Sequence, residues 1–152
     1  MAVRPLYIFD LDGTISDPSH RIHFITSDPN DWDAFYAACI DDDPIGETIR
    51  VLRALYEDGC DVEIWSGRSD AVRRETLNWL SLHAPFTART ERLTMRPAGD
   101  HRDDAVLKKE WLDGLAPFDR SRLVAAFEDR QRVVDMWRAA GVTCYQVAPG
   151  NF

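Results

Sequence analysis

Short apolar runs alternate along this chain with segments whose apolar residues recur at helical spacing, and this alternation limits the possible folds more than any other feature. The apolar runs predict strands at residues 6–9, 62–66, 92–95, 123–127 and 143–147. Helical spacing predicts helices at residues 32–38, 44–59, 70–83, 103–114 and 130–140, and residues 11–31 are expected to form a long loop. Strands that alternate with helices favour an α/β fold, a parallel sheet with helices on both faces.

Nothing in the sequence divides the chain, so we expect a single domain over residues 1–152. Its 45% hydrophobic and 29% charged residues are typical of a globular protein. No apolar run approaches the ~20 residues of a membrane span, and the first five residues lack the layout of a signal peptide. Cys39, Cys60 and Cys144 form no CxxC pair and are expected to be free, buried thiols. A cytoplasmic location without membrane attachment follows as the expectation.

The charge is unevenly distributed. The net charge of −8 argues against tight binding to long nucleic acid, which needs a basic surface. Residues 66–109 nevertheless hold nine bases and six acids, while the remaining residues hold nine bases and twenty acids. A locally basic stretch in an acidic protein is better suited to a small or terminal anionic ligand.

Polar side chains follow the predicted strands where those strands end. In a parallel sheet these ends meet at one edge, which is where ligands bind. Carboxylates that converge beside a hydroxyl and a lysine indicate a site for a hard cation and an anion, and Mg²⁺ fits best because it combines carboxylates with phosphate oxygens. The residues concerned are Asp10 with Asp12, Ser66, Lys108 at the start of a helix, and the pair Glu128 and Asp129.

Each of these groups has a purely structural alternative. Asp10 to Gly13 fit a turn with side-chain hydrogen bonds, and Ser66 to Arg68 fit a turn that starts a helix. An acidic pair before a helix complements its dipole, and a helix-face lysine is commonly solvated. Only the joint pattern, four groups at strand ends or a helix start, favours a site.

In that order, the four groups resemble the motifs of the haloacid dehalogenase-like (HAD) phosphohydrolases. The first motif, DxDGT, is present unmodified at residues 10–14, and Ser66 after an apolar strand, Lys108 and the acidic pair correspond to the other three. This resemblance implies a Rossmann-like sheet with a minimal cap or none.

A closer resemblance is to the 3′-phosphatase domain of bacteriophage polynucleotide kinase. It runs from residue 6 to the C-terminus, is dense after Gly99, and includes Ser66-Gly67-Arg68 and the position of Arg21. No GxxxxGK[ST] phosphate loop occurs, so the kinase half has no counterpart here. One departure is Glu128, because that family usually has two aspartates where this chain has Glu128 and Asp129.

The resemblance implies a reaction through an aspartyl-phosphate. Asp10 would be the nucleophile, with Lys108 reducing the repulsion between its carboxylate and the phosphate. Asp12 would act as general acid on the leaving oxygen and then as general base for water, a role that requires a raised pKa. Mg²⁺ would be held by the carboxylate of Asp10, the backbone carbonyl of Asp12 and the carboxylate of Asp129, and a ligand role for Glu128 stays open.

The same resemblance implies a set of substrate contacts. Backbone groups of the turn at Gly13, together with Ser66, would hold the phosphoryl oxygens, and Arg21 and Arg68 would contact the phosphate or sugar of a nucleotide. The full set of expected substrate-binding residues is Gly13, Thr14, Arg21, Ser66, Gly67 and Arg68.

The leading hypothesis is a Mg²⁺-dependent phosphatase that acts on nucleic-acid 3′ ends or nucleoside 3′-phosphates. A 5′-nucleotide or small-metabolite phosphatase is the alternative, and a non-catalytic binding module is an alternative of another class. A homo-oligomer and a separate kinase or ligase partner stay open. The helical stripe of Trp32, Phe35 and Tyr36 is expected to be core or interface, with base stacking as the minor alternative.

Overall fold

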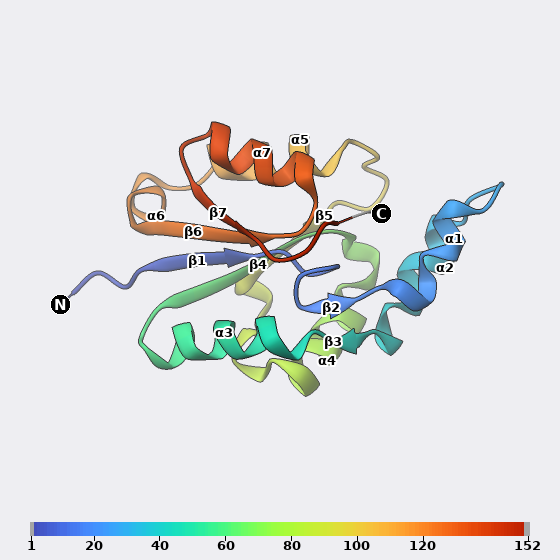
Figure 1. Cartoon of the computed structure of the whole chain (residues 1–152), viewed down its shortest axis with the longest axis horizontal. Coiled ribbons are helices and arrows are strands. Elements are labelled where there is room, and N and C mark those ends of the chain that lie inside the picture. The colour runs from blue at the N-terminus through green and yellow to red at the C-terminus, as the bar shows by residue number, and fades with distance from the viewer. Residues whose placement is uncertain (1, 151–152) are drawn as a thin grey trace.

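The computed structural model describes residues 2–150 and contains a five-stranded parallel sheet in the order β5-β4-β1-β6-β7 (Figure 1). The strands are β1 (Leu6–Phe9), β4 (Asp61–Ser69), β5 (Leu93–Arg96), β6 (Leu123–Glu128) and β7 (Thr143–Gln146). Helices α3 (Gly46–Glu57) and α4 (Arg73–His83) cover one face, and α5 (Asp104–Asp113) and α7 (Gln131–Ala139) cover the other. The expected α/β fold is confirmed.

Alternation along β1 divides the apolar core between the two faces of the sheet. Phe9 packs in the cluster that holds Leu52 of α3 and Leu80 of α4. Leu6 and Ile8 belong to the cluster on the other face, beneath α5 and α7. Because successive side chains of a strand point to opposite faces, the short apolar run at the start of the chain contributes to both halves of the core. Packing on both faces fixes the position of β1 in the sheet, and with it the position of Asp10, which follows β1 directly.

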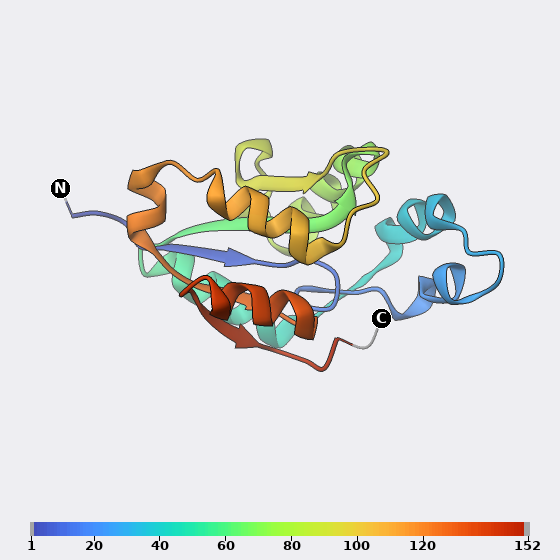
Figure 2. The ribbon, with the colours of Figure 1, turned by 90° about the horizontal axis from the view of Figure 1, so that it is seen from above.

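A small helical insertion lies beyond the carboxyl ends of the strands (Figure 2). It contains α1 (His23–Thr26) and α2 (Trp32–Ala37), and it is flanked by β2 (Ser16–Asp17) and β3 (Asp43–Pro44), which pair antiparallel. Residues 11–31 are therefore not the continuous loop that the sequence predicts. Pro44 pairs with Ser16 instead of starting a helix, and α3 begins at Gly46. The expected minimal cap corresponds to this insertion.

Other boundaries differ from the sequence-based expectation in smaller ways. Strand β4 continues to Ser69, with an irregular register beside β5 between Ser66 and Ser69, so Ser66 lies within the strand. A short helix that the sequence did not predict, α6 (Pro117–Arg122), precedes β6. Short 3₁₀ helices span Ser19–Arg21, Ala38–Asp41, Asp70–Val72, Pro85–Thr87 and Thr90–Arg92.

The three cysteines are free and buried, as expected. Among residues 2–150, no helix combines the length and the apolar character that a membrane span requires.

Candidate active site

The end of β1, the end of β6 and the second turn of α5 bring three carboxylates and one ammonium group together. Asp10 follows β1 directly, and its backbone N–H donates to the Phe127 carbonyl of β6 over 2.9 Å. Lys108 Nζ donates to Asp10 Oδ1 over 2.8 Å and to Glu128 Oε2 over 2.9 Å. Asp10, Lys108, Glu128 and Asp129 are all buried. The predicted convergence of these four side chains is therefore present in the fold.

The carboxylates in this group outnumber the positive charge beside them. One oxygen each of Asp10, Glu128 and Asp129 lies within 4.8 Å of the others. Burial, and next the charge of Asp10, raise the pKa of Glu128 well above its ordinary value and that of Asp129 to about 8. Burial would lower the pKa of Lys108, but the neighbouring Asp10 and Glu128 outweigh it and raise that pKa.

This group has the donors that a hard divalent cation requires. Asp129 Oδ2 is buried and has no hydrogen-bond partner among residues 2–150. An unpartnered buried carboxylate oxygen is costly, and carboxylates crowded at one point repel each other unless a cation lies between them. The donors are all oxygen atoms, which suits Mg²⁺, Ca²⁺ or Mn²⁺ better than a thiolate-binding metal. The residues present therefore fit a divalent metal.

The turn after Asp10 brings backbone close to these carboxylates. Gly13 has a φ of +84°, a conformation that residues with a Cβ rarely adopt, and its N–H donates to the Ser16 carbonyl over 2.8 Å. The Thr14 hydroxyl lies 3.4 Å from both Asp10 Oδ2 and Asp129 Oδ1, so it connects the end of β1 with the end of β6. The glycine and threonine of the DxDGT motif thus have structural roles in this turn.

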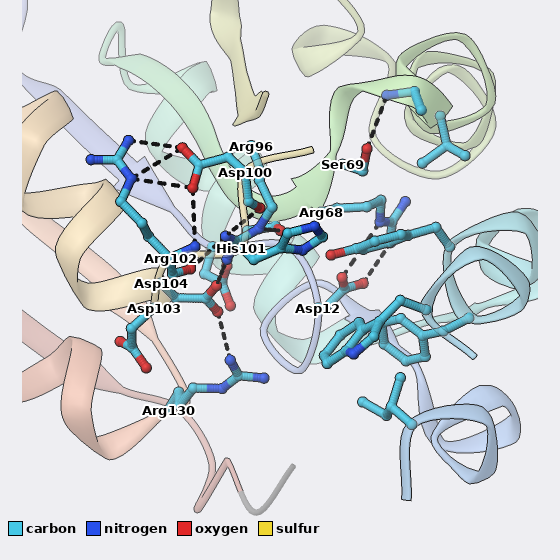
Figure 3. A pocket seen from close by; sticks show the side chains of 18 of the residues that line it. Asp12, Arg68, Ser69, Arg96, Asp100, His101, Arg102, Asp103, Asp104 and Arg130 are labelled. Atoms are coloured by element: carbon cyan, nitrogen blue, oxygen red, sulfur yellow. Dashed lines mark hydrogen bonds and ion pairs between the residues drawn. The ribbon is translucent and has the colours of Figure 1, made fainter. Parts of the chain in front are cut away.

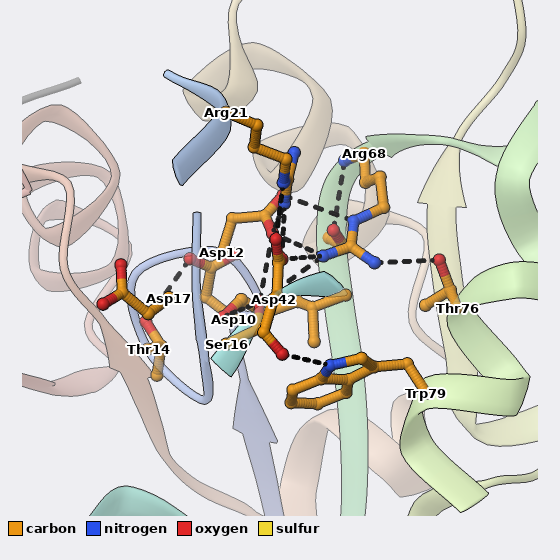
Figure 4. Close-up of polar contacts among 12 residues, drawn as sticks. Asp10, Asp12, Thr14, Ser16, Asp17, Arg21, Asp42, Arg68, Thr76 and Trp79 are labelled. Carbon is orange, nitrogen blue, oxygen red and sulfur yellow. Dashed lines mark hydrogen bonds and ion pairs between the residues drawn. The ribbon is translucent and has the colours of Figure 1, made fainter. Parts of the chain in front are cut away.

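Two buried arginines converge on Asp12 and Asp42 (Figure 4). Arg21 donates to Asp12 Oδ1 over 2.6 Å, and to both oxygens of Asp42 over 2.7 Å. Arg68 donates to Asp12 Oδ1 over 2.5 Å and to Asp42 Oδ2 over 3.2 Å. The Asp42 carbonyl also accepts a hydrogen bond from the Trp79 indole N–H over 2.8 Å. We call Asp12, Arg21, Asp42 and Arg68 the arginine–aspartate network.

The network keeps Asp12 ionised. Burial alone would raise the pKa of Asp12, but the positive charges of Arg68 and Arg21 and their hydrogen bonds outweigh it and hold the pKa well below its ordinary value. A general acid needs the opposite shift, since it must carry a proton near neutral pH. The raised pKa required for the first half of the expected role is therefore not produced by this environment.

A cavity of about 530 Å³ opens beside the carboxylates (Figure 3). It is lined by Asp10, Asp12 and Glu128, by Trp32 and Tyr36 of α2, and by residues 99–104. Figure 3 shows His101 and Arg68 near the centre of the view, with Asp12 below Arg68.

Ion pairs fix the loop side of this cavity. Both oxygens of the Asp104 carboxylate are held, one by Arg96 and the other by Arg130 over 2.6 Å. A Cβ on Gly67 would lie 2.5 Å from Asp104 Oδ1, so the absence of a side chain at Gly67 lets this carboxylate approach β4.

Only some of the predicted substrate contacts face the cavity. Gly67 and Arg68 line it, although the Arg68 side chain is buried, as are Thr14, Arg21 and Ser66. Ser66 Oγ accepts a hydrogen bond from the Arg68 N–H over 3.1 Å. Gly13 and Asp129 line a second cavity of about 410 Å³ on the other side of the turn.

Three residues of the site were not predicted from the sequence: Asp42, Arg96 and Asp104. The chain carries a weak signal for Asp104, which stands beside the expected helix start. It carries none that separates Asp42 from its acidic neighbours Asp41 and Asp43.

Comparison with known proteins identifies relatives of the whole described chain. Residues 4–152 match the family described as the polynucleotide kinase PNKP phosphatase domain. A chain in the structure of the Pnkp1/Rnl/Hen1 RNA repair complex is 30% identical, with a TM-score of 0.78. The match covers 98% of this chain and 44% of that one, so the present chain spans less than half the length of that relative.

More distant structures share the fold alone. The class C acid phosphatase from Bacillus anthracis is 18% identical with a TM-score of 0.63, and the match covers 91% of this chain and 60% of that one. A structure of the same phosphatase with tungstate bound has the same identity and TM-score, and the match covers 93% of this chain and 62% of that one.

Proposed function

The chain belongs to the family of polynucleotide kinase phosphatase domains, and from that premise we propose that it is a Mg²⁺-dependent 3′-phosphatase of polynucleotide ends or nucleoside 3′-phosphates. It is a HAD-type phosphatase, a hydrolase of phosphate monoesters. The identity of the metal, the 3′ preference and the residue roles below belong to the proposal.

The observation that carries the proposal is the position of Asp10. Asp10 lines the cavity, and its carboxylate has the Lys108 ammonium 2.8 Å away. Phosphate monoesters are dianions, so an anionic nucleophile can approach phosphorus only where positive charge offsets the repulsion. Lys108 supplies one such charge, and it keeps the carboxylate oriented.

In the first step Asp10 attacks phosphorus, and the bond from phosphorus to the ester oxygen breaks as the aspartyl-phosphate forms. The leaving oxygen takes a proton from the carboxyl group of Asp12, and the ester is released as an alcohol. In the second step water attacks the aspartyl-phosphate, loses a proton and regenerates the Asp10 carboxylate with release of phosphate.

For the second step Asp12 already has the protonation state of a general base, although the arginines that hold its pKa low also make it a weak base. Its ionised carboxylate lines the cavity and can accept the proton of the attacking water. For the first step Asp12 must first gain a proton. Arg68 also lines the cavity, with its guanidinium buried against Asp12, and a bound phosphate that draws away one of its N–H groups would weaken the interaction that keeps Asp12 ionised.

A divalent metal would be held by Asp10 and Asp129, the two carboxylates that share the Thr14 hydroxyl, together with the backbone carbonyl of Asp12. Glu128 is the third carboxylate of the group, and Lys108 already binds it. The metal would supply a positive charge to the oxygens of the phosphoryl group.

The 3′ preference is inferred from family membership and from the relative in an RNA repair complex. That relative's chain is more than twice as long. A separate kinase or ligase that acts on the same broken strand is the partner that we propose. Whether RNA or DNA is preferred is left to experiment.

The test compares phosphate release from two oligonucleotides of identical sequence, one with a 3′-phosphate and one with a 5′-phosphate, each with Mg²⁺ and with EDTA. We expect release from the 3′ isomer with Mg²⁺ and little from the other three reactions. Asp10→Asn is the negative control and should lose at least about 1000-fold in rate, because it removes the nucleophile while keeping the side-chain size. Equal rates on both isomers would favour the second candidate, a 5′-nucleotide or small-metabolite phosphatase, which the acidic net charge of −8 supports.

A further inference from the structure

Helix α2 presents an aromatic surface to the cavity. Trp32 and Tyr36 are four residues apart and Phe35 lies between them in the same turn, so the three rings share one side of the helix. Trp32 and Tyr36 line the cavity with ring centroids 5.9 Å apart, and Phe35 is buried with its ring edge-on to Trp32 at 5.6 Å. All three residues of the stripe that the sequence predicts to be core or interface therefore line the cavity, and of the three only Phe35 is also buried.

The aromatic surface is attached to the reacting end of the cavity. The Arg21 guanidinium lies 4.2 Å over the Phe35 ring and donates to the Phe35 carbonyl over 3.2 Å. The same guanidinium donates to Asp12 over 2.6 Å. The position of α2 relative to Asp12 is thus determined by one buried side chain, so the rings stand at a fixed place beside the carboxylates.

The charged groups on the loop side of the cavity already have partners. Arg102 pairs with Asp100 over 2.8 Å, Arg132 with Asp103 over 2.8 Å, and Asp104 with both Arg96 and Arg130. Trp32, in contrast, is 44% exposed although it is one of the most hydrophobic side chains of the chain. A large exposed ring beside charged groups that are already paired is the surface of this cavity with most to gain from a planar apolar ligand.

The cavity is larger than a phosphate group needs. Its volume of about 530 Å³ lies in the range of pockets that enclose whole small molecules. If the phosphate lies at Asp10, the remaining space extends along α2. A nucleobase fits this space chemically, because base–aromatic stacking tolerates any base sequence.

We propose that Trp32, supported by Tyr36, stacks against the terminal nucleobase of the substrate. The inference rests on the proposed function and specifies it: the cavity takes a whole unpaired nucleotide, and the base contributes to binding through α2. The phosphate and the carboxylates then determine the chemistry, while the ring of Trp32 determines how well the end of the strand is held.

The experiment compares wild type and Trp32→Ala on two substrates. The substrates are single-stranded oligonucleotides with a 3′-phosphate that differ only in whether the last sugar carries a base or is abasic. We expect Trp32→Ala to lower kcat/KM on the base-containing end roughly tenfold, mainly through KM, and to leave the abasic end unchanged. Trp32→Phe should restore most of the loss, because it keeps an aromatic face.

Phe118→Ala is the matched control, since Phe118 is an exposed aromatic residue, 61% accessible, that does not line the cavity. Phe118→Ala should leave kcat/KM unchanged on both substrates. An equal loss on both ends for Trp32→Ala would assign the residue a purely structural role and overturn the inference. No loss on either end would also overturn it and leave Trp32 as a surface for another protein.

The same assay tests the proposed function independently of the stacking of the base. The wild-type rate on the abasic 3′-phosphate reports 3′-phosphatase activity, and the ratio between the two ends reports stacking. If wild type cleaves neither end, the proposed function fails, and stacking is then measured by calorimetry as binding of adenosine 3′-phosphate. In that assay, unchanged affinity in Trp32→Ala overturns the inference, and affinity roughly tenfold weaker supports it.

Discussion

Asp42 is a buried carboxylate whose two oxygens and backbone carbonyl all have partners from distant parts of the chain. Removing one member of a buried ion pair leaves the others without compensation, which typically costs about 3–5 kcal/mol. We expect Asp42→Asn to lower the free energy of unfolding by about 3 kcal/mol, measured by urea denaturation.

The neighbouring Asp41→Asn is the control for this prediction, because Asp41 is exposed and should change stability by less than about 0.5 kcal/mol. Similar losses in both variants would mean that the arginine–aspartate network contributes little to stability.

The contrast between Asp42 and Asp10 explains which site residues the sequence could indicate. Asp10 follows an apolar strand, so its place at the end of the sheet is set by local pattern. Asp42 lies in an acidic run, Asp41 to Asp43, where composition favours a solvated surface. Its burial depends on Arg21 and Arg68, and contacts between distant segments leave no local pattern. The same holds for Arg68: the sequence shows the motif that contains it but not its partners Asp12 and Asp42.

Asp129 gives the metal-free protein a pH dependence with a definite sign. Its pKa is about 8 in the fold, whereas an unfolded aspartate titrates near 4, so the native state binds the proton more tightly. This contribution to stability is complete below about pH 4 and is lost as the pH rises through about 8. We therefore expect the free energy of unfolding in EDTA to fall over this interval, and Asp129→Asn to reduce the slope.

Added Mg²⁺ competes with that proton. It should raise the melting temperature more at pH 8 than at pH 5, because a metal binds the ionised carboxylate and stabilises the native state by mass action. The same increase in melting temperature at both pH values would show that Asp129 does not bind the metal.

At the scale of elements, the close approach of β4 to the start of α5 gives a prediction about Gly67. A methyl group there would displace the Asp104 carboxylate, which Arg96 and Arg130 hold in place. Gly67→Ala should therefore lose about 1–3 kcal/mol of stability in urea denaturation.

Gly46→Ala is the matched glycine variant. A Cβ there meets no atom of the described chain within 4 Å, and the residue begins helix α3. It should be neutral or stabilising by up to about 1 kcal/mol. A loss at Gly46 as large as at Gly67 would contradict the steric argument.

Elements with a strong local period were predictable, and elements made by pairing were not. Strand β1 and helix α2 agree with the sequence within one residue, because apolar spacing alone defines them. The two-residue strands β2 and β3 exist only because Ser16 meets Pro44 and Asp17 meets Asp43, residues that lie far apart in the sequence. The spacing of apolar residues carries no information on such a pairing. The sequence therefore predicts a helix start at Pro44, where proline is also favoured.

At the scale of the whole molecule, the expectation of a single domain becomes a prediction about unfolding. The insertion that carries α1 and α2 joins the sheet through the arginine–aspartate network, and both faces of the sheet share β1. We expect one cooperative transition, with coincident urea curves from tryptophan fluorescence and far-ultraviolet circular dichroism. Two separated transitions would show that the insertion or one layer of the core unfolds independently.

The arginine–aspartate network has a consequence for how this scaffold can diversify. Arg21 and Asp42 come from the insertion, whereas Asp12 lies in the turn after β1 and Arg68 in β4, so one charged junction joins the insertion to the sheet beside the cavity. An insertion transplanted from a distant relative would bring a new ligand preference but remove half of that junction. New specificity is therefore expected to arise more readily by replacing individual side chains along α2 than by exchanging the whole insertion, because such replacements leave the arginine–aspartate network intact.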